Sequence, residues 1–169
     1  KVVTMNIQRV VRHFCMTQGR VRRAFSPATL KTIEETIAAC EATHEGEICF
    51  VVEAALDASA LLHQQSARDR ALELFSSMNI WDTEHNCGVL IYLLFADHKV
   101  EIVADRGIHA QSGTAAWNRI CADMTATFKQ SRFEEGAVQG IQAIARELVA
   151  HFPAQAGHRN ELPDPPILI

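Results

Sequence analysis

The stretch WDTEHNCG, residues 81–88, concentrates side chains that could do chemistry. It supplies two carboxylates, one imidazole and one amide within five positions: Asp82, Glu84, His85 and Asn86. Carboxylate and amide oxygens suit calcium or magnesium, whereas a histidine ligand would favour zinc or manganese. The same residues could instead form a polar loop between a helix and the apolar run VLIYLLF that follows. Their meaning depends on the elements around them.

Hydrophobic periodicity predicts those elements in the order α-α-β-α-β-β-α-α. We expect helices over residues 3–17, 27–45, 66–78, 114–130 and 133–152, and strands over 47–56, 88–96 and 100–104. QGRVRR, residues 18–23, is predicted to be a basic turn. A strand–helix–strand unit makes its two strands parallel, and a tight turn makes the next pair antiparallel. The predicted fold class is therefore α/β, a small mixed sheet with helices on both faces and an extra N-terminal helix.

The 169 residues are expected to form one domain in three parts. These parts are an N-terminal helix and basic turn (1–24), a central domain (25–152) and a Pro-rich tail (153–169), which we expect to be extended. Five arginines between Arg9 and Arg23 form a basic patch that could contact phosphate or a partner, although a solvated helix face explains them more simply.

The predicted topology brings three polar clusters to one edge of the sheet. If Asp97 and His98 form a two-residue hairpin turn, Asp105 lies opposite Leu90. His109 then lies opposite Asn86. The parallel strand that starts at HEGE, residues 44–47, begins at the same edge. The clusters are Glu45 with Glu47, Asp82 to Asn86, and Asp105 with Arg106 and His109.

This edge predicts a divalent-cation site, with a calcium or magnesium ion as the expected cofactor. The predicted ligands are Asp82, Glu84, Asn86 and Asp105, with Glu47 and His85 as further candidates, and Arg106 and His109 would contact phosphate or a partner. No spacing matches an EF-hand, a Walker A loop or HExxH. The alternative is structural: Asp105 and Arg106 form an ion pair, and Asp82 or Asn86 caps a turn. Cys87 is disfavoured as a nucleophile because it directly precedes a buried strand.

Composition limits the class of protein. Apolar residues at 48% and charged residues at 21% are typical of globular domains, and a net charge of −4 argues against nucleic-acid binding. Five widely spaced cysteines without a CxxC pair predict free, mostly buried thiols in a reducing compartment. No apolar stretch is long enough to span a bilayer and no signal-peptide pattern is visible, so the chain is expected to be cytoplasmic.

Three segments resemble the TPM domain, which is named for thylakoid lumen, photosystem II repair and nematode receptor auxiliary proteins. FSPATLKTIEETIAACEATHEGEICFVVEAAL resembles its opening, with a Ser-Pro helix start and an entry into a strand at Glu-Ile. NCGVLIYLLFADHKVEIVADRGI resembles the central signature, and SRFEEGAVQGIQAI resembles the closing helix. The resemblance covers about residues 25–150. ADRG stands where the family has a Gly-Tyr-Gly type turn, and Cys87 stands where it has an asparagine.

The resemblance implies an α/β sandwich and divalent-cation binding near the acidic edge. Acid phosphatase activity is ascribed to plant members, and bacterial members are often linked to the envelope. Our hypothesis is a cation-binding, non-catalytic interaction module with an unknown protein partner. The alternative is a metal-assisted acid phosphatase, a phosphomonoesterase that uses Asp82, Asp105 and Arg106.

Overall fold

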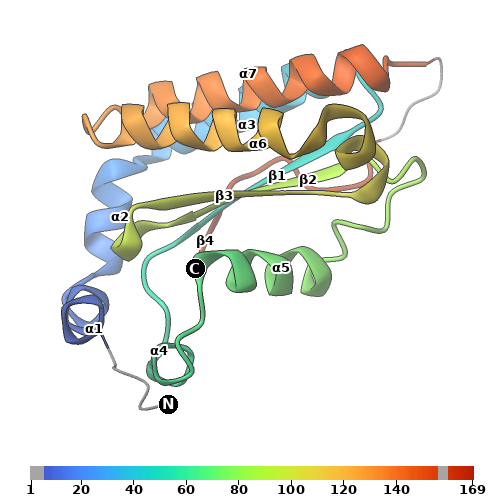
Figure 1. Ribbon diagram of the computed structural model, residues 1–169. Helices are drawn as coiled ribbons and strands as arrows, with labels where there is room; N and C mark the ends of the chain where they lie inside the picture. The colour runs from blue at the N-terminus through green and yellow to red at the C-terminus, as the bar shows by residue number, and fades with distance from the viewer. Residues whose placement is uncertain (1–5, 156–159) are drawn as a thin grey trace.

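A four-stranded sheet runs through the centre of the molecule, as a computed structural model shows for residues 6–155 and 160–169 (Figure 1). The strands are β1 Glu47–Glu53, β2 Gly88–Leu94, β3 Lys99–Ala104 and β4 Ile167–Leu168. The helices are α1 Ile7–Phe14, α2 Gln18–Ala24, α3 Pro27–Glu41, α4 Ala58–Leu62, α5 Ala67–Ser77, α6 Arg106–Phe128 and α7 Phe133–His151, with a 3-10 turn, η1, at Phe95–Asp97.

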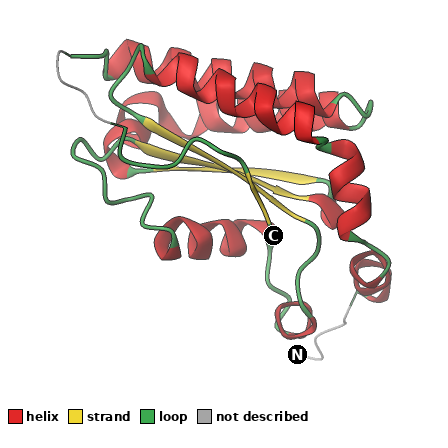
Figure 2. Ribbon diagram, turned by 180° about the vertical axis from the view of Figure 1, so that it is seen from behind, coloured by secondary structure: helices red, strands yellow, loops and turns green. Residues whose placement is uncertain are grey.

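The sheet order is β3-β2-β1-β4, with β1 parallel to β2 and β2 antiparallel to β3. Helices α3, α6 and α7 cover one face and α5 covers the other, and both views show these layers (Figures 1 and 2). This confirms the predicted fold class, a mixed sheet with helices on both faces.

Burial on both faces explains the apolar strands. Every residue of β1 and β2 is buried. Phe50 and Val52 point into the core under α3, α6 and α7, while Cys49 and Val51 belong to the core on the α5 side. Strands covered on both faces show continuous apolar runs instead of alternation. Trp117 of α6 is also buried, as predicted.

The predicted hairpin register is wrong by two residues. Leu94 pairs with Lys99, so four residues, 95–98, form the turn instead of two. The turn is longer because Phe95–Asp97 form a 3-10 turn that ends at His98, whose φ of 51° is left-handed. Asp105 therefore donates its backbone N–H to the carbonyl of Gly88 at 2.9 Å and does not lie opposite Leu90.

The N-terminal region corrects a second prediction. The sequence predicts a basic turn at QGRVRR, but these residues belong to helix α2. Thr17 takes the extended N-cap conformation before the helix, and Val21 is fully buried in the main core. Burial of Val21 outweighs the low helix propensity of Gly19.

The described part of the C-terminal tail, residues 153–155 and 160–169, adds a strand that no periodicity predicted, and residues 156–159 lie outside the described residues. β4 pairs with the free edge of β1, where Ile169 donates to Val52 at 2.9 Å and Ala54 donates to Ile169 at 2.9 Å. The predicted helix 114–130 also starts earlier, at Arg106, and is interrupted at Gly113, which has a φ of 73°. Among the described residues, no helix is both long and apolar enough to span a membrane.

Candidate functional site

The three polar segments meet at one end of the sheet, which we call the loop edge: residues 44–47, 81–87 and 105–109. Arg106 Nε donates to Asn86 Oδ1 at 3.2 Å, which joins the loop before β2 to the start of α6. His85 Nε2 lies 3.6 Å from Glu45 Oε2, which joins the same loop to the segment before β1. Topology thus brings the segments together although the register prediction is wrong.

Asp105 is one of the buried carboxylates of the loop edge, with 8% of its surface exposed. It is the N-cap of α6, and its Oδ1 accepts the backbone N–H of Arg106 at 2.6 Å. Its Oδ2 is buried and accepts no hydrogen bond from the part of the chain that the structure describes. The ion pair that the structural alternative predicts does not form, because the Arg106 side chain turns to Asn86.

Loop 82–86 displays its acidic side chains at the surface. Asp82 and Glu84 are exposed, as is His85. Asn86 takes a left-handed conformation, with a φ of 52°. The backbone oxygen of Asn86 accepts the N–H of Gly107 at 3.1 Å. A Cβ at Gly107 would lie 2.5 Å from this oxygen, so the glycine permits the close approach between the loop and α6.

The predicted partner His109 lies on α6 and is exposed. Its backbone N–H donates to the carbonyl of Asp105 at 2.8 Å, which is the first turn of the helix. In the corrected register the residue across from Asn86 is Gly107. His109 therefore belongs to the loop edge because it lies in the first turn of α6, and not because it pairs with Asn86.

Two carboxylates of the loop edge hold the C-terminal tail. Glu47 is fully buried, and its carboxylate accepts the backbone N–H groups of Glu161 at 3.0 Å and Leu162 at 3.1 Å. Glu45 accepts the backbone N–H of Gln155. These contacts span more than 100 residues of sequence, and no local pattern predicts them.

Sequence reasoning missed Glu41, a buried acid at the end of α3. Its Oε1 accepts the N–H of Ile48 at 2.8 Å. Burial raises the pKa of Glu41 to about 8, and the nearby Glu47 and Asp164 add to the shift, against the hydrogen bond from Ile48. One signal was available: Glu41 follows Ile37 by four residues, on the buried stripe of the helix.

The Cys87 thiol is fully buried at the loop edge and donates to the carbonyl of Glu45 at 3.3 Å. Burial raises the pKa of this thiol to about 12, with further contributions from Glu161 and Glu47. A nucleophilic cysteine needs a thiolate near neutral pH. The environment of Cys87 opposes that role.

Comparison with known proteins decides the family. The TPM domain family matches residues 22–147, most of the chain. The chain belongs to the TPM domain family. This confirms the resemblance carried by the opening, central and closing segments of the sequence.

Solved structures share the TPM fold seen here. The NMR structure of the BA42 protein from the psychrophilic bacterium Bizionia argentinensis is 26% identical, with a TM-score of 0.75, over 85% of this chain and 94% of that chain. The N-terminal domain of a P. gingivalis protein is 20% identical, with a TM-score of 0.60, over 77% and 82% of the two chains. No curated protein sequence matches the chain.

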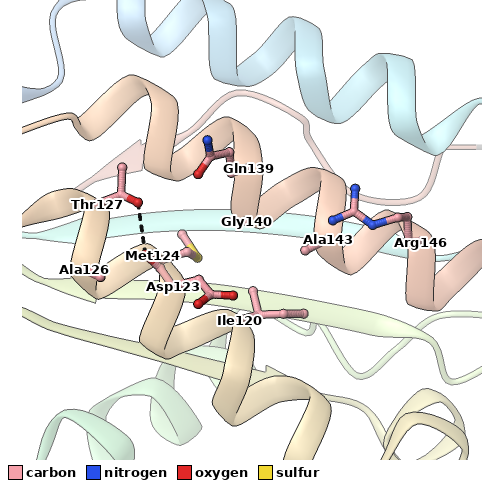
Figure 3. Close-up of a pocket in the computed structure, with 9 residues that line it drawn as sticks. All are labelled: Ile120, Asp123, Met124, Ala126, Thr127, Gln139, Gly140, Ala143 and Arg146. Atoms are coloured by element: carbon pink, nitrogen blue, oxygen red, sulfur yellow. Dashed lines mark hydrogen bonds between the residues drawn. The ribbon is translucent and has the colours of Figure 1, made fainter.

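The TPM domain also has a groove of about 430 Å³ between α6 and α7, which is separate from the loop edge (Figure 3). Its charged residues are Asp123 and Arg146, and no residue of the loop edge lines it. A Cβ at Gly140 would overlap the Met124 side chain, so the glycine lets the two helices approach closely. We interpret this groove as a feature of helix packing.

Proposed function

We propose that this TPM domain is a non-catalytic interaction module whose loop edge binds a divalent cation, calcium or magnesium. The observation that carries the proposal is Asp105 Oδ2, a buried carboxylate oxygen without a hydrogen-bond donor in the described chain. Leaving such an atom unsatisfied costs about 1–3 kcal/mol. A cation at this oxygen would offset that cost.

The proposed ligands are oxygen atoms, as calcium and magnesium require. Asp105 is the central proposed ligand. Asn86 accepts a hydrogen bond from Arg106, the residue that follows Asp105. Asp82 and Glu84 are exposed on the adjoining loop and would supply further carboxylates. Glu47 and His85 already contact the tail and Glu45, so we place them in supporting positions.

Residues 6–155 and 160–169 contain no three His, Cys, Asp or Glu side chains that could hold a metal ion as they stand. Asn86, backbone carbonyls and water must therefore complete the coordination. We propose that loop 82–86 adjusts over the bound ion. Moderate affinity is expected, because ordering a loop opposes binding.

Support for a non-catalytic role comes from the same geometry. The Cys87 thiol is buried and has a raised pKa, about 12, so it is a poor nucleophile. Arg106 and His109 are exposed next to the proposed cation site. We propose that these two side chains contact the protein partner, with the cation ordering the surface between them.

Calorimetric titration with calcium, magnesium and zinc tests the proposal. Wild type is expected to bind calcium or magnesium saturably. Asp105→Asn keeps an N-cap residue but removes the charge, so affinity should fall by at least about tenfold. Asp82→Asn should weaken binding less, because Asp82 is exposed. Asp123→Asn, an exposed acid of α6, is the matched control and should bind as wild type does. No saturable binding by wild type would overturn the proposal.

The second candidate is a metal-assisted phosphomonoesterase at Asp82, Asp105 and Arg106. One observation favours it: an exposed guanidinium lies beside the proposed cation site, and the two positive groups could neutralise phosphate charge. Turnover of p-nitrophenyl phosphate with and without the bound cation separates the two functions. Metal-dependent turnover that Asp82→Asn and Asp105→Asn both abolish would establish the enzyme and replace the non-catalytic module.

A further inference from the structure

Helix α2 carries positive charge that the fold does not neutralise. Its three arginines, Arg20, Arg22 and Arg23, are exposed. Within the described residues, none of them forms an ion pair or a side-chain hydrogen bond. By contrast, Arg9, Arg70 and Arg132 each contact a carboxylate. The segment from Asn6 to Phe25 contains no acidic residue, so no local carboxylate is available to α2.

Two of these arginines border a shallow cavity of about 550 Å³ that is widely open to solvent. Arg20 and Arg23 come from α2, His98 from the turn between β2 and β3, and Ser131 from the α6–α7 connection. Met16, Phe95 and Phe133 supply apolar surface. No acidic residue lines the cavity. Cations and an apolar surface therefore converge from segments that are far apart in the sequence.

The apolar surface belongs to an aromatic cluster that extends into the core. The centroid of Phe133 lies 5.5 Å from those of Phe25 and Phe95, and 5.6 Å from that of Phe128. Phe25 is 1% exposed and anchors the cluster in the core. A ligand at this surface would meet a preformed aromatic wall, which lowers the entropic cost of binding.

The polar groups are placed by unusual backbone conformations. His98 and Ser131 have left-handed φ values of 51° and 60°. Each follows a short turn, in which His98 donates to the Phe95 carbonyl and Ser131 to the Phe128 carbonyl. The turns bring an imidazole and a hydroxyl to the cavity that holds Arg20 and Arg23.

We infer that this cavity binds a small amphiphilic anion, with a carboxylate or phosphate-type group on Arg20 and Arg23 and an apolar body on Phe95 and Phe133. A guanidinium presents parallel donors that match such anions, and aromatic rings favour contact with an apolar group. The volume is large enough for a small molecule, which would be held on one side and stay exposed to solvent on the other. The site is at the turn end of the sheet and does not depend on the loop edge.

Phenylphosphonate is a suitable probe, because its C–P bond resists hydrolysis and it combines the two proposed features. Titration of the full chain, followed by amide NMR, should give saturable shifts at Arg20, Arg23, His98 and Ser131. Inorganic phosphate tests the charge alone and benzyl alcohol tests the apolar part alone. Both should bind at least about tenfold more weakly than phenylphosphonate.

Arg20→Gln/Arg23→Gln should weaken phenylphosphonate binding by at least about tenfold, as expected when two charge-assisted contacts are lost. Arg22→Gln is the matched control, because Arg22 is exposed on the same helix but does not line the cavity. His98→Asn preserves the left-handed backbone and should weaken binding less.

Any of these results would overturn the inference: no saturable shift, equal binding of inorganic phosphate, unchanged binding in Arg20→Gln/Arg23→Gln, or an equal loss in Arg22→Gln. A glutamate-rich peptide that displaces phenylphosphonate at far lower concentration would also overturn it, in favour of a protein partner. Failure at this cavity would leave calcium binding at the loop edge unaffected, since the two sites share no residue.

Discussion

Two aspartates flank β3, and the fold treats them in opposite ways. Asp97, before the strand, contacts Arg9 at 2.8 Å, Arg12 at 3.1 Å and His13 at 3.1 Å. Asp105, after the strand, caps α6 with one oxygen and leaves the other buried without a donor in the described chain. Both carboxylates are largely buried, so burial does not explain the difference.

The difference separates a carboxylate that holds two parts of the fold together from the one that we propose as a cation ligand. Burial acts to raise the pKa of Asp97, but hydrogen bonds from Arg9 and His13 outweigh it and hold the pKa below its ordinary value. His13 also accepts the Leu56 N–H at 3.0 Å, so Asp97 connects α1 to the body of the domain. Asp105 has no such cationic partner among the described residues, and this is why we propose it as the carboxylate that binds a cation.

The largest expected effect comes from neutralising each aspartate in turn. Asp97→Asn removes the charge that Arg9 and His13 face, and should lower the free energy of unfolding by about 2–3 kcal/mol. Asp105→Asn keeps the helix cap and should change the free energy of unfolding by less than about 0.5 kcal/mol in the absence of divalent cations. Urea denaturation in chelator measures both. Equal losses would remove the distinction between the two carboxylates.

A glycine substitution tests the close contact that forms the loop edge. A Cβ at Gly107 would lie 2.5 Å from the Asn86 oxygen and 2.9 Å from the His85 oxygen. Gly107→Ala should therefore cost about 2 kcal/mol and weaken cation binding. Gly113→Ala, with no atom within 4 Å but a φ of 73°, is the control and should cost about 1 kcal/mol. Retained calcium affinity in Gly107→Ala would show that the site does not need this contact.

Some of this comparison was predictable from the sequence. The strand–helix–strand unit and the hairpin placed residues 44–47, 82–86 and 105–106 at one edge. The register was not predictable, because η1 and the left-handed His98 lengthen the turn without a distinctive motif. Errors of two residues preserve the face and edge of a strand, so the location of the candidate site survived.

The partners of Asp97 could not be predicted from local patterns. Arg9 and His13 lie more than 80 residues away from Asp97 in the sequence. Their spacing of four residues predicts only that they share one face of a helix, not what that face contacts. The same limit applies to Glu47, whose backbone partners are Glu161 and Leu162. β4 has two residues beside prolines, and its pairing depends on the open edge of β1. Such contacts depend on tertiary structure and not on periodicity.

A separate, pH-dependent prediction concerns Glu41, whose pKa of about 8 exceeds its ordinary value of 4.5. The folded protein therefore binds a proton that the unfolded chain releases. The stability from this proton is full below the ordinary value and is lost as pH rises toward 8, with a slope of up to about 1.4 kcal/mol per pH unit.

Glu41→Gln should flatten the stability profile between pH 5 and pH 8, roughly the range that the shift spans. Asp97 has the opposite sign, because its lowered pKa gives stability that is lost as pH falls through the folded-state value. The acid limb of the profile should thus persist in Glu41→Gln. Urea denaturation across pH measures both limbs, and an unchanged neutral limb in this variant would contradict the assignment.

The most direct test of the account compares both ends of β3 in one calcium titration followed by amide NMR. In wild type, signals of Asn86, Asp105 and Arg106 should shift saturably, while those of His98 and Lys99 stay in place. In Asp105→Asn the shifts at the loop edge should disappear. Absence of saturable shifts in wild type, or their persistence in Asp105→Asn, would contradict the claim that Asp105 is the carboxylate left available for a cation.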